Sequence, residues 1–504
     1  FKILPDKYVQ REMFFNCLPF CGDIKFLFGN GAKRSLAVTN KTASALLPIF
    51  SEWKGTGTGH VALISRTGQL MTVSLHDSQT NKNAVIAAES GSGKSFYTNE
   101  LLTMYMSEGA RCWVIDIGRS YAKLCESLNG EFISFEESKH PCLNAFELCE
   151  NYDESSDTLK ALIQTMIAPK STLTDQQCSV LSRIIDEQWA IHKKSLNIDK
   201  IEAALREQGN KEKDMRIIDM ATQLYAFTTK GAYGKYFNGK NNITFQKNFT
   251  VLELEELSGR ENLRKVVLLQ LIFQIQQAVF LAQDRDQKKI VMIDEGWDLL
   301  KEGQSVKFME HAYRKFRKYN GSMIIATQSL NDLYSSAEAG KAIAENSAFY
   351  FLLHQKPETV EQVKAEKRLD MSEGGYNFLK SVYTVAGAFS ELFIKSGAGT
   401  GVGRLIVSDF QKLLYSTDPV DVQAINNYVK HGLNYVQAVN RVLIDRGLYH
   451  DFTPEHGQSP WISEDTLKEV VRERIKLDDL KDEENIMTIA KIVYEEMKEN
   501  QDAV

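Results

Sequence analysis

Two short segments of the chain carry residues whose types and spacing suit the chemistry of nucleotide phosphates. The first is AESGSGKS, residues 88–95, which follows an apolar run and precedes a helical pattern. Gly91 and Gly93 can adopt positive φ, so consecutive backbone N–H groups can converge on one phosphate. The dipole of the following helix points at the same anion, so the segment predicts a phosphate-binding loop. The residues expected to contact the nucleotide are Ser90, Gly91, Ser92, Gly93, Lys94, Ser95 and Phe96.

Two side chains of this loop are expected to act on ATP and Mg²⁺. Lys94 would reach the β- and γ-phosphates, and the hydroxyl of Ser95 would bind Mg²⁺. The usual pattern begins with glycine, whereas this chain has Ala88, which is sterically close. The alternative is a chance glycine turn, and the strand before the loop and the helix after it argue against that alternative.

The second segment is an acid pair, Asp294 and Glu295, directly after the apolar run IVMI. A carboxylate at the C-terminal end of a strand lies where open α/β sheets bind ligands. Asp294 is expected to hold Mg²⁺, directly or through a water molecule, and Glu295 to act as the general base that polarises the attacking water. Such a pair alone would be ordinary solvated surface, but the phosphate loop upstream favours catalysis.

A third apolar run, residues 322–326, leads to Gln328. At the end of a core strand beside the acid pair, the amide of Gln328 could sense the γ-phosphate or orient the attacking water. The alternative is a side chain that merely caps the strand.

Arginines near these strands are candidates for a finger that acts on the nucleotide of a neighbouring subunit. Arg314 and Arg317, three residues apart, fall on one basic helix with Lys315 and Lys318, which could also be a solvated face. We expect Arg317 to be the finger, because a guanidinium suits the charge spread over the phosphoryl oxygens. Arg404, in a glycine-rich segment predicted to be a loop at 397–403, is the rival.

Asp116 is a further candidate acid, and two other protein families can be rejected. Asp116 ends the strand expected beside the phosphate-loop strand, where it could cap the turn through Gly118 or lie near Mg²⁺. An ABC-type ATPase is rejected, because Arg260 replaces the second glycine of the signature LSGG. A Rossmann dehydrogenase is excluded by the spacing of the glycines.

The elements that must position these residues form β-loop-α-β units, which imply a parallel sheet with right-handed crossovers. The expected strands are Val61–Ser65, Leu70–Ser74, Ala84–Ala88, Arg111–Asp116, Ile243–Leu254, Lys289–Ile293, Ser322–Ala326, Ala348–Leu353 and Glu391–Ile394. The predicted fold class is therefore α/β, a RecA-like P-loop NTPase with a mostly parallel sheet.

The predicted domains interrupt this core with helices. Residues 1–60 are expected to be the remnant of an upstream N-terminal domain and a hinge, so the chain would be a piece of a longer protein. The ATPase core would occupy 61–150 and 236–420, separated by an all-α insertion at 151–235. Residues 421–504 would form a helical C-terminal tail.

Composition and net charge limit the classes of function that the protein can have. The 504 residues are 43% hydrophobic and 25% charged, with a net charge of −6, as in a soluble globular protein without general attraction for nucleic acid. Seven scattered cysteines suggest reduced thiols in the cytosol, and the nine histidines do not cluster as in a structural metal site. The longest uncharged run, residues 266–282, contains four glutamines and is short for a membrane span, so it predicts a buried helix and no transmembrane segment.

Four stretches together resemble the TraC-type conjugation ATPases of type IV secretion systems. They are SGSGKSF at 90–96, WVIDIGRSY at 113–121, IDEGWDLL at 293–300 with ATQSL at 326–330, and GTGVGRL at 399–405, before an expected strand. The second and third are much more specific than the phosphate loop. The resemblance spans roughly residues 15–420, and it departs from the family at Asn144-Ala145-Phe146, where a typical member has Asn-Pro-Phe.

The resemblance implies a homo-hexameric ATPase attached to the inner-membrane base of a conjugative pore. Its partners would be inner-membrane components of the secretion machinery and other secretion ATPases, with only weak binding of nucleic acid. It would be cytoplasmic, peripheral on the inner face of the bacterial inner membrane. The expected function is to energise channel assembly or transport through the channel. A hexameric DNA-translocating ATPase related to coupling proteins is the alternative, and an assembly scaffold that binds ATP without needing Glu295 is a third interpretation.

Overall fold

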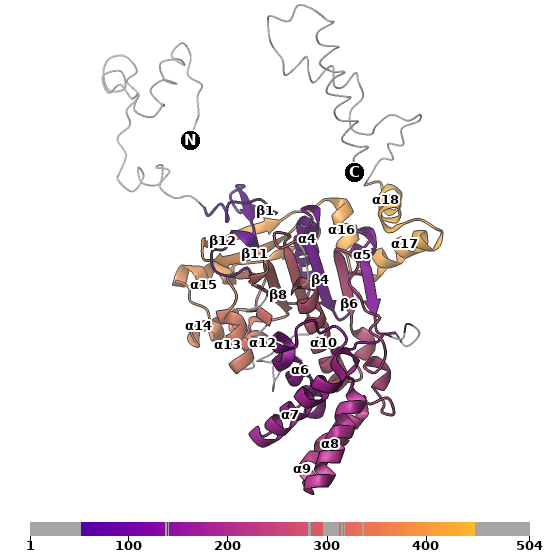
Figure 1. Ribbon diagram of the computed structural model, residues 1–504. Coiled ribbons are helices and arrows are strands. Elements are labelled where there is room, and N and C mark those ends of the chain that lie inside the picture. Colours follow the sequence, from indigo (N-terminus) through magenta and orange to yellow (C-terminus); the bar gives the residue numbers. More distant parts are fainter. Residues whose placement is uncertain are drawn as a thin grey trace, which may run out of the picture. The chain divides into compact units, whose positions relative to one another are not determined.

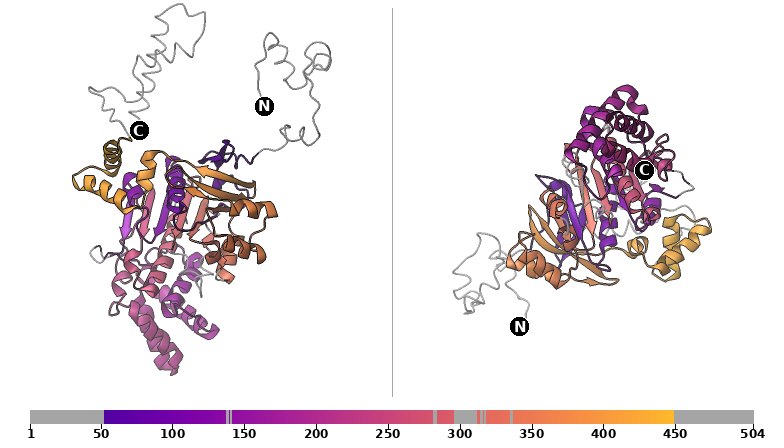
Figure 2. Two further views of the ribbon diagram at one scale, coloured as in Figure 1. Left: turned by 180° about the vertical axis from the view of Figure 1, so that it is seen from behind. Right: turned by 90° about the horizontal axis from the view of Figure 1, so that it is seen from below.

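The computed structural model describes residues 52–136, 139, 141–280, 284–295, 312–313, 316, 318–334 and 337–448. The chain divides into two compact units, Phe1–Trp53 and Lys54–Val504, and the described residues lie almost entirely in the second. Figure 1 shows its helices and strands, and Figure 2 shows them from behind and from below. The predicted basic helix is only partly described, and Arg314 and Arg317 lie outside the described residues.

A single mixed sheet of 12 strands organises this unit, in the order β2-β1-β12-β11-β9-β3-β8-β7-β4-β6-β5, with β10 paired to β11. Seven neighbouring strands are parallel and form what we call the parallel half: β9 (Phe349–Leu352), β3 (Ala84–Ala87), β8 (Gly321–Thr327), β7 (Lys289–Asp294), β4 (Arg111–Asp116), β6 (Phe249–Glu253) and β5 (Glu131–Ser134). The predicted α/β fold with a mostly parallel sheet is confirmed.

The other five strands form the antiparallel half, which joins the parallel half where β11 pairs with β9. They are β1 (Val61–Ser65), β2 (Leu70–Val73), β10 (Thr384–Val385), β11 (Phe389–Ser396) and β12 (Gly399–Leu405). Strands β11 and β12 make a long hairpin, and β1 pairs with β12 far along the sequence.

Burial explains why the central strands read as continuous apolar runs. Every residue of β3, β7 and β8 is buried, as expected where helices cover both faces of a parallel sheet.

The helices outside the insertion are α4 (Lys94–Ser107), α5 (Ala122–Ser127), α10 (Glu261–Phe280), α12 (Leu330–Tyr334), α13 (Ala337–Glu345), α14 (Pro357–Ala365), α15 (Glu373–Lys380), α16 (Asp409–Tyr415), α17 (Pro419–Lys430) and α18 (Tyr435–Asp445). Short 3-10 helices are η1 (Leu75–Asp77), η3 (Lys193–Ser195), η4 (Tyr225–Phe227), η5 (Gly234–Tyr236) and η6 (Glu255–Leu257).

Between β5 and β6 the described chain is helical, with α6 (Tyr152–Ile167), α7 (Asp175–His192), α8 (Ile198–Glu212) and α9 (Met215–Leu224). Helices α7, α8 and α9 extend away from the sheet, and α6 lies against α10 (Figure 1). One hydrophobic core runs from the parallel strands through α10 into these helices. This segment is where the all-α insertion was predicted, and its status as a separate domain stays a prediction.

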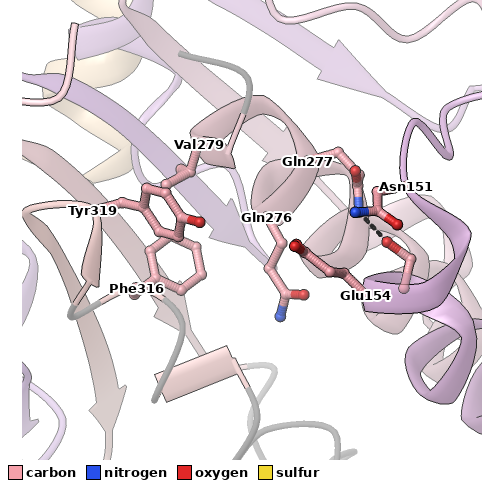
Figure 3. Close-up of a pocket in the computed structure, with 8 residues that line it drawn as sticks. Asn151, Glu154, Gln276, Gln277, Val279, Phe316 and Tyr319 are labelled. Carbon is pink, nitrogen blue, oxygen red and sulfur yellow. Dashed lines mark hydrogen bonds between the residues drawn. The ribbon is translucent and has the colours of Figure 1, made fainter. Parts of the chain in front are cut away.

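A small cavity lined by polar and apolar side chains lies where α6 meets α10 (Figure 3). Its volume is about 20 Å³, and on its wall the Gln277 amide donates to the hydroxyl of Ser155 at 3.1 Å. That volume suits about one water molecule, so the cavity is a structural feature of the insertion and not a ligand site.

Three sequence predictions about strands were wrong. Asp116 does not end a strand beside the phosphate-loop strand, because β8 and β7 lie between β3 and β4. The glycine-rich segment at 397–403 is not a loop, since most of it belongs to β12. The strand expected from residue 243 begins only at Phe249.

The uncharged run predicted to be a buried helix forms most of α10, with Val267, Leu271 and Ile275 fully buried. Within the described ranges, no helix combines the length and the apolar character that crossing a membrane requires.

Candidate active site

The phosphate loop connects β3 to α4 with the backbone conformation that its glycines permit. Gly91 and Gly93 have φ of 78° and 98°, in the left-handed region. A Cβ at Gly93 would also lie 2.2 Å from the hydroxyl oxygen of Ser390, so this position excludes a side chain for a second reason. Gly93 is the N-cap of α4, and the first N–H groups of this helix therefore face the loop.

Within the loop, Ser92 does not behave like its neighbours. Its hydroxyl donates to the carbonyl of Glu89 at 2.6 Å, and its N–H donates to the same oxygen at 3.0 Å. Its own carbonyl accepts from the hydroxyl of Thr384 on β10 at 2.8 Å. Both donors of Ser92 are thus used within the loop, and its predicted contact with the nucleotide stays a prediction. The other loop residues predicted to bind, Ser90, Gly91, Gly93, Lys94, Ser95 and Phe96, all line one cleft.

Lys94 reaches across to the acid pair at the end of β7. Its ammonium group donates to Asp294 Oδ1 at 2.5 Å and to Glu295 Oε1 at 2.9 Å. Burial lowers the pKa of Lys94, but the charges of the two carboxylates and the hydrogen bonds to them outweigh burial, so the pKa is raised above its ordinary value. The ammonium group therefore stays charged and can bind an anion.

The two acids differ in their surroundings. Asp294 ends β7 and is 1% exposed, whereas the side chain of Glu295 is 37% exposed and faces the cleft. Glu295 has φ of 59°, a conformation that costs energy for a residue with a side chain and that is found at functional sites. The amide of Gln328, directly after β8, donates to Glu295 Oε1 at 3.2 Å. The structure thus brings together Lys94, Asp294, Glu295 and Gln328, as the sequence predicted.

Sequence reasoning gave no role to Tyr121, although Tyr121 lies in one of the quoted motifs. Its buried hydroxyl donates to Asp294 Oδ2 at 2.7 Å and lies 2.8 Å from the hydroxyl of Thr98 on α4. Burial raises the pKa of Tyr121 well above its ordinary value, so the hydroxyl keeps its proton and donates. Tyr121 thereby fixes the orientation of the Asp294 carboxylate relative to the helix that begins at the phosphate loop.

The donor set around Asp294 fits Mg²⁺. A carboxylate oxygen of Asp294, which contacts Lys94, and the hydroxyl of Ser95, the residue after Lys94 in α4, are hard oxygen ligands of the kind that Mg²⁺ prefers. Among the described residues, no group of three or more His, Cys, Asp or Glu side chains could hold a metal ion by itself. This agrees with the way Mg²⁺ binds in phosphoryl-transfer sites, through one or two protein ligands together with phosphate oxygens and water.

Two further buried acids, Asp116 and Glu253, hold the turn after β4. Asp116 Oδ2 accepts from the N–H of Ser120 at 2.7 Å, so Asp116 caps the turn after β4. Glu253, at the end of β6, accepts from the N–H groups of Gly118 and Arg119 in the same turn. Burial and the charges of Asp294 and Glu253 raise the pKa of Asp116 well above its ordinary value. Of its two predicted roles, the structure shows the turn cap.

The cleft in front of these groups has a volume of about 600 Å³. One end is formed by the phosphate loop, Glu295 and Gln328, and one wall by residues Thr384–Ser390 of the β10–β11 hairpin. The cleft continues past Phe96 to α16, α17 and the end of α18, which sequence analysis did not connect with the site. No signal in the sequence joined these helices to the loop, because about 300 residues separate them.

Arg404, the rival candidate for the arginine finger, does not join this group within its own chain. Arg404 lies on β12, where its Nε donates to Glu391 Oε1 at 3.1 Å and its guanidinium lies 4.4 Å from the centre of the Phe389 ring. Arg404 is thus held by its own chain, outside the lining of the cleft. Arg317 falls outside the described residues, so its role stays a prediction.

Comparisons with known proteins agree with this geometry. A family model described as the TraG P-loop domain matches residues 69–446. Protein TraC of Escherichia coli K12 is 25% identical over 467 residues, covering 87% of this chain and 52% of that protein. Type IV secretion system protein virB4 of Bartonella henselae is 20% identical over 380 residues, covering 74% of this chain and 46% of that protein. The chain spans about half the length of these curated relatives.

A solved structure shares the fold. The structure of VirB4 of Thermoanaerobacter pseudethanolicus matches with a TM-score of 0.57 and 20% identity, covering 73% of this chain and 99% of that one. At this identity the likeness concerns the fold alone. It supports the P-loop NTPase architecture that the phosphate loop and the parallel half indicate.

Proposed function

Because this chain belongs to the TraG P-loop domain family, we propose that it hydrolyses ATP to energise a conjugative type IV secretion channel. The resemblance to TraC-type proteins predicted from the sequence is confirmed by the matches to TraC and VirB4. The observation that carries the proposal is the convergence of Lys94, Asp294, Glu295 and Gln328 at the phosphate loop. This set can bind a triphosphate and activate water, whereas a site that only bound ATP would not need the exposed carboxylate.

The hydrogen bonds suggest how binding prepares hydrolysis. Lys94 contacts the carboxylates of Asp294 and Glu295 together. When ATP enters, its β- and γ-phosphates attract Lys94, which leaves Glu295 free to accept a proton. The attacking water then forms a bond to the γ-phosphorus, its proton passes to Glu295, and the bond from that phosphorus to the bridging oxygen breaks to give ADP and phosphate.

The remaining residues hold the reactants in place. Gln328, already bonded to Glu295, can donate to the same water or to the γ-phosphate. Mg²⁺, held by Ser95 and Asp294, would neutralise the charge of the β- and γ-oxygens. The hydrogen bond from Tyr121 fixes the orientation of the Asp294 carboxylate, which would hold this ion.

The assembly belongs to the same proposal. We place the working enzyme in a homo-hexamer in which Arg317 of one subunit acts on the nucleotide of the next. Its position would be the cytoplasmic face of the inner membrane, attached to the inner-membrane components of the secretion machinery and to other secretion ATPases. The match to the type IV secretion system protein virB4 supports the link to secretion machinery.

The test replaces Glu295 by glutamine, which keeps the shape and the hydrogen bond from Gln328 but cannot take a proton. ATP binding should remain, while turnover falls by roughly 10²-fold or more, the range that a general base contributes. Fluorescent-nucleotide binding and phosphate release measure the two effects. Glu207→Gln, an exposed residue of α8, is the matched control and should change neither.

Other outcomes separate the alternatives. Full turnover in Glu295→Gln would remove the general base from the proposal, and an equal loss of affinity would assign Glu295 to metal binding or folding. ATP binding without turnover in the unmodified chain would favour a scaffold. Turnover stimulated by DNA, with tight DNA binding at physiological salt, would favour a DNA translocase, whereas the net charge of −6 predicts weak binding that fades as salt rises.

A further inference from the structure

The cleft is longer than its phosphate end requires. Beyond Phe96 it is bounded by α16, by the turn to α17 and by the end of α18. The motifs behind the proposed function do not reach α16, α17 or α18. We call this part the far half of the cleft.

The far half offers apolar surface beside the first turn of α4. Leu405 and Leu413 are 4% and 5% exposed and form its floor. Phe96 lies edge-on to Tyr415 with ring centres 6.2 Å apart, and Leu448 is 56% exposed at the rim. Apolar and aromatic side chains around an open space suit a flat aromatic group.

The charges of the far half are paired, in contrast to the phosphate end. Lys412 bonds to Asp409 at 2.8 Å, and Arg446 bonds to Asp421 at 2.7 Å. Two cations and two anions give no net attraction for phosphate. They do provide donors and acceptors for an uncharged polar ligand, such as the hydroxyl groups of a sugar and the edge of a base.

The far half is held at a fixed distance from the phosphate loop. Gln411 and Tyr415 of α16 donate to Glu100 Oε2 on α4 at 2.7 and 2.8 Å. Behind α16, the buried Lys123 of α5 donates to the carbonyl of Leu413 at 3.1 Å. Helix α16 is therefore attached to the helix whose N-terminus is expected to bind the phosphates.

From these observations we propose that the far half binds the nucleoside part of the nucleotide. The base packs between Phe96 and Leu413, and the paired side chains of α16, α17 and α18 recognise the sugar and the base edge. This inference rests on the proposed function, since it assumes that the triphosphate occupies the phosphate loop. It adds that helices after residue 408 determine affinity for the nucleoside.

The test compares ATP with inorganic triphosphate, which lacks a nucleoside. Thr417 is exposed in the turn before α17 and lines the far half, so Thr417→Trp should fill this space without disturbing the core. We expect the Kd of MgATP to rise at least about tenfold while the Kd of magnesium triphosphate stays unchanged. Arg446→Ala, at an exposed position, should weaken ATP selectively by a smaller factor. Thr222→Trp, exposed on α9, is the matched control and should change neither Kd.

The results separate this inference from the proposed function. If Thr417→Trp and Arg446→Ala weaken ATP and triphosphate equally, or weaken neither, the inference is overturned. It is also overturned if the unmodified chain binds ATP no more tightly than triphosphate. If that chain binds ATP selectively but does not hydrolyse it, the proposed function fails and the nucleoside site stands.

Discussion

The two halves of the sheet meet at the phosphate loop and contribute to it in different ways. In the parallel half, all strands end at the same edge, so Asp294, Glu295 and Gln328 gather there together with the loop itself. In the antiparallel half, neighbouring strands run in opposite directions, and a hairpin reaches the loop instead. Thr384 bonds to the carbonyl of Ser92, and Ser390 packs against Gly93.

The ion pairs of the two halves also differ, in whether the charged partners can separate. Lys94 and its carboxylates can separate, since the phosphates of a ligand offer Lys94 an alternative partner. Glu391 is 0% exposed and lies between Arg66 and Arg404, which donate to it at 3.0 and 3.1 Å. A buried carboxylate with two guanidinium partners has no alternative partner, so it stays paired. In the proposed reaction, the parallel half therefore carries the exchangeable charges, and the antiparallel half holds the loop in shape.

The largest expected effect comes from removing the exchangeable cation. Lys94→Ala should abolish ATP turnover, because it removes the mobile cation expected at the β- and γ-phosphates. It also leaves Asp294 and Glu295 facing the phosphates unpaired. Phosphate release measures the effect, with Lys211→Ala on α8 as an exposed control. Turnover at the unmodified rate in Lys94→Ala would show that the site lies elsewhere.

The second-largest expected effect concerns the arginine finger and which half of the sheet supplies it. Arg317→Ala subunits should bind ATP but lose turnover, by roughly 10³-fold or more if the finger resembles those of well-studied GTPases. Mixed with Glu295→Gln subunits, they should regain some activity, because a mixed interface can pair an intact base with an intact finger. Phosphate release by hexamers shown to contain both subunits is the measurement.

The same test can also assign the role of the finger to Arg404, the rival candidate. Normal turnover in Arg317→Ala, with no rescue in mixed hexamers, would move the role to Arg404 and to the antiparallel half. Arg404→Lys is then the variant to compare, because it keeps a positive charge near the buried Glu391.

The smallest expected effect on catalysis belongs to Glu391. Glu391→Gln removes the charge between two arginines that are about a quarter exposed, so we expect a loss of about 2–3 kcal/mol in the free energy of unfolding, somewhat below the cost at fully buried pairs. Below the melting temperature, turnover should change little. Denaturant unfolding and phosphate release measure both. A large loss of turnover in a stably folded variant would contradict the division of roles, in which the antiparallel half supports the loop and takes no part in the reaction.

The sequence revealed the parallel half more fully than the antiparallel half, for physical reasons. Strands buried on both faces read as apolar runs, and two of them lead to polar residues at the ligand edge: β7 ends at Asp294, and Gln328 directly follows β8. The order of these strands was not predictable, because pairing between β3 and β8 depends on contacts about 240 residues apart. For that reason Asp116 was placed beside the wrong strand.

Glycine misled the interpretation of the antiparallel half. Glycines 399, 401 and 403 suggested a loop, but they lie in β12. A Cβ at Gly403 would come within 2.9 Å of the side chain of Leu63 on the neighbouring strand β1, so glycine is required there by a close approach between strands. The roles of Tyr121 and of α16 also depend on distant contacts, and local patterns do not encode them.

The double contact of Lys94 with Asp294 and Glu295 has a consequence for how tightly the protein holds its ligand. Asp294 and Glu295 would compete with a phosphate for the ammonium group of Lys94, since both carboxylates contact it. The affinity expected for a phosphate is therefore the difference between two attractions to one ammonium group. A site built in this way can release its products readily, because the carboxylates recapture Lys94 as soon as the phosphate leaves.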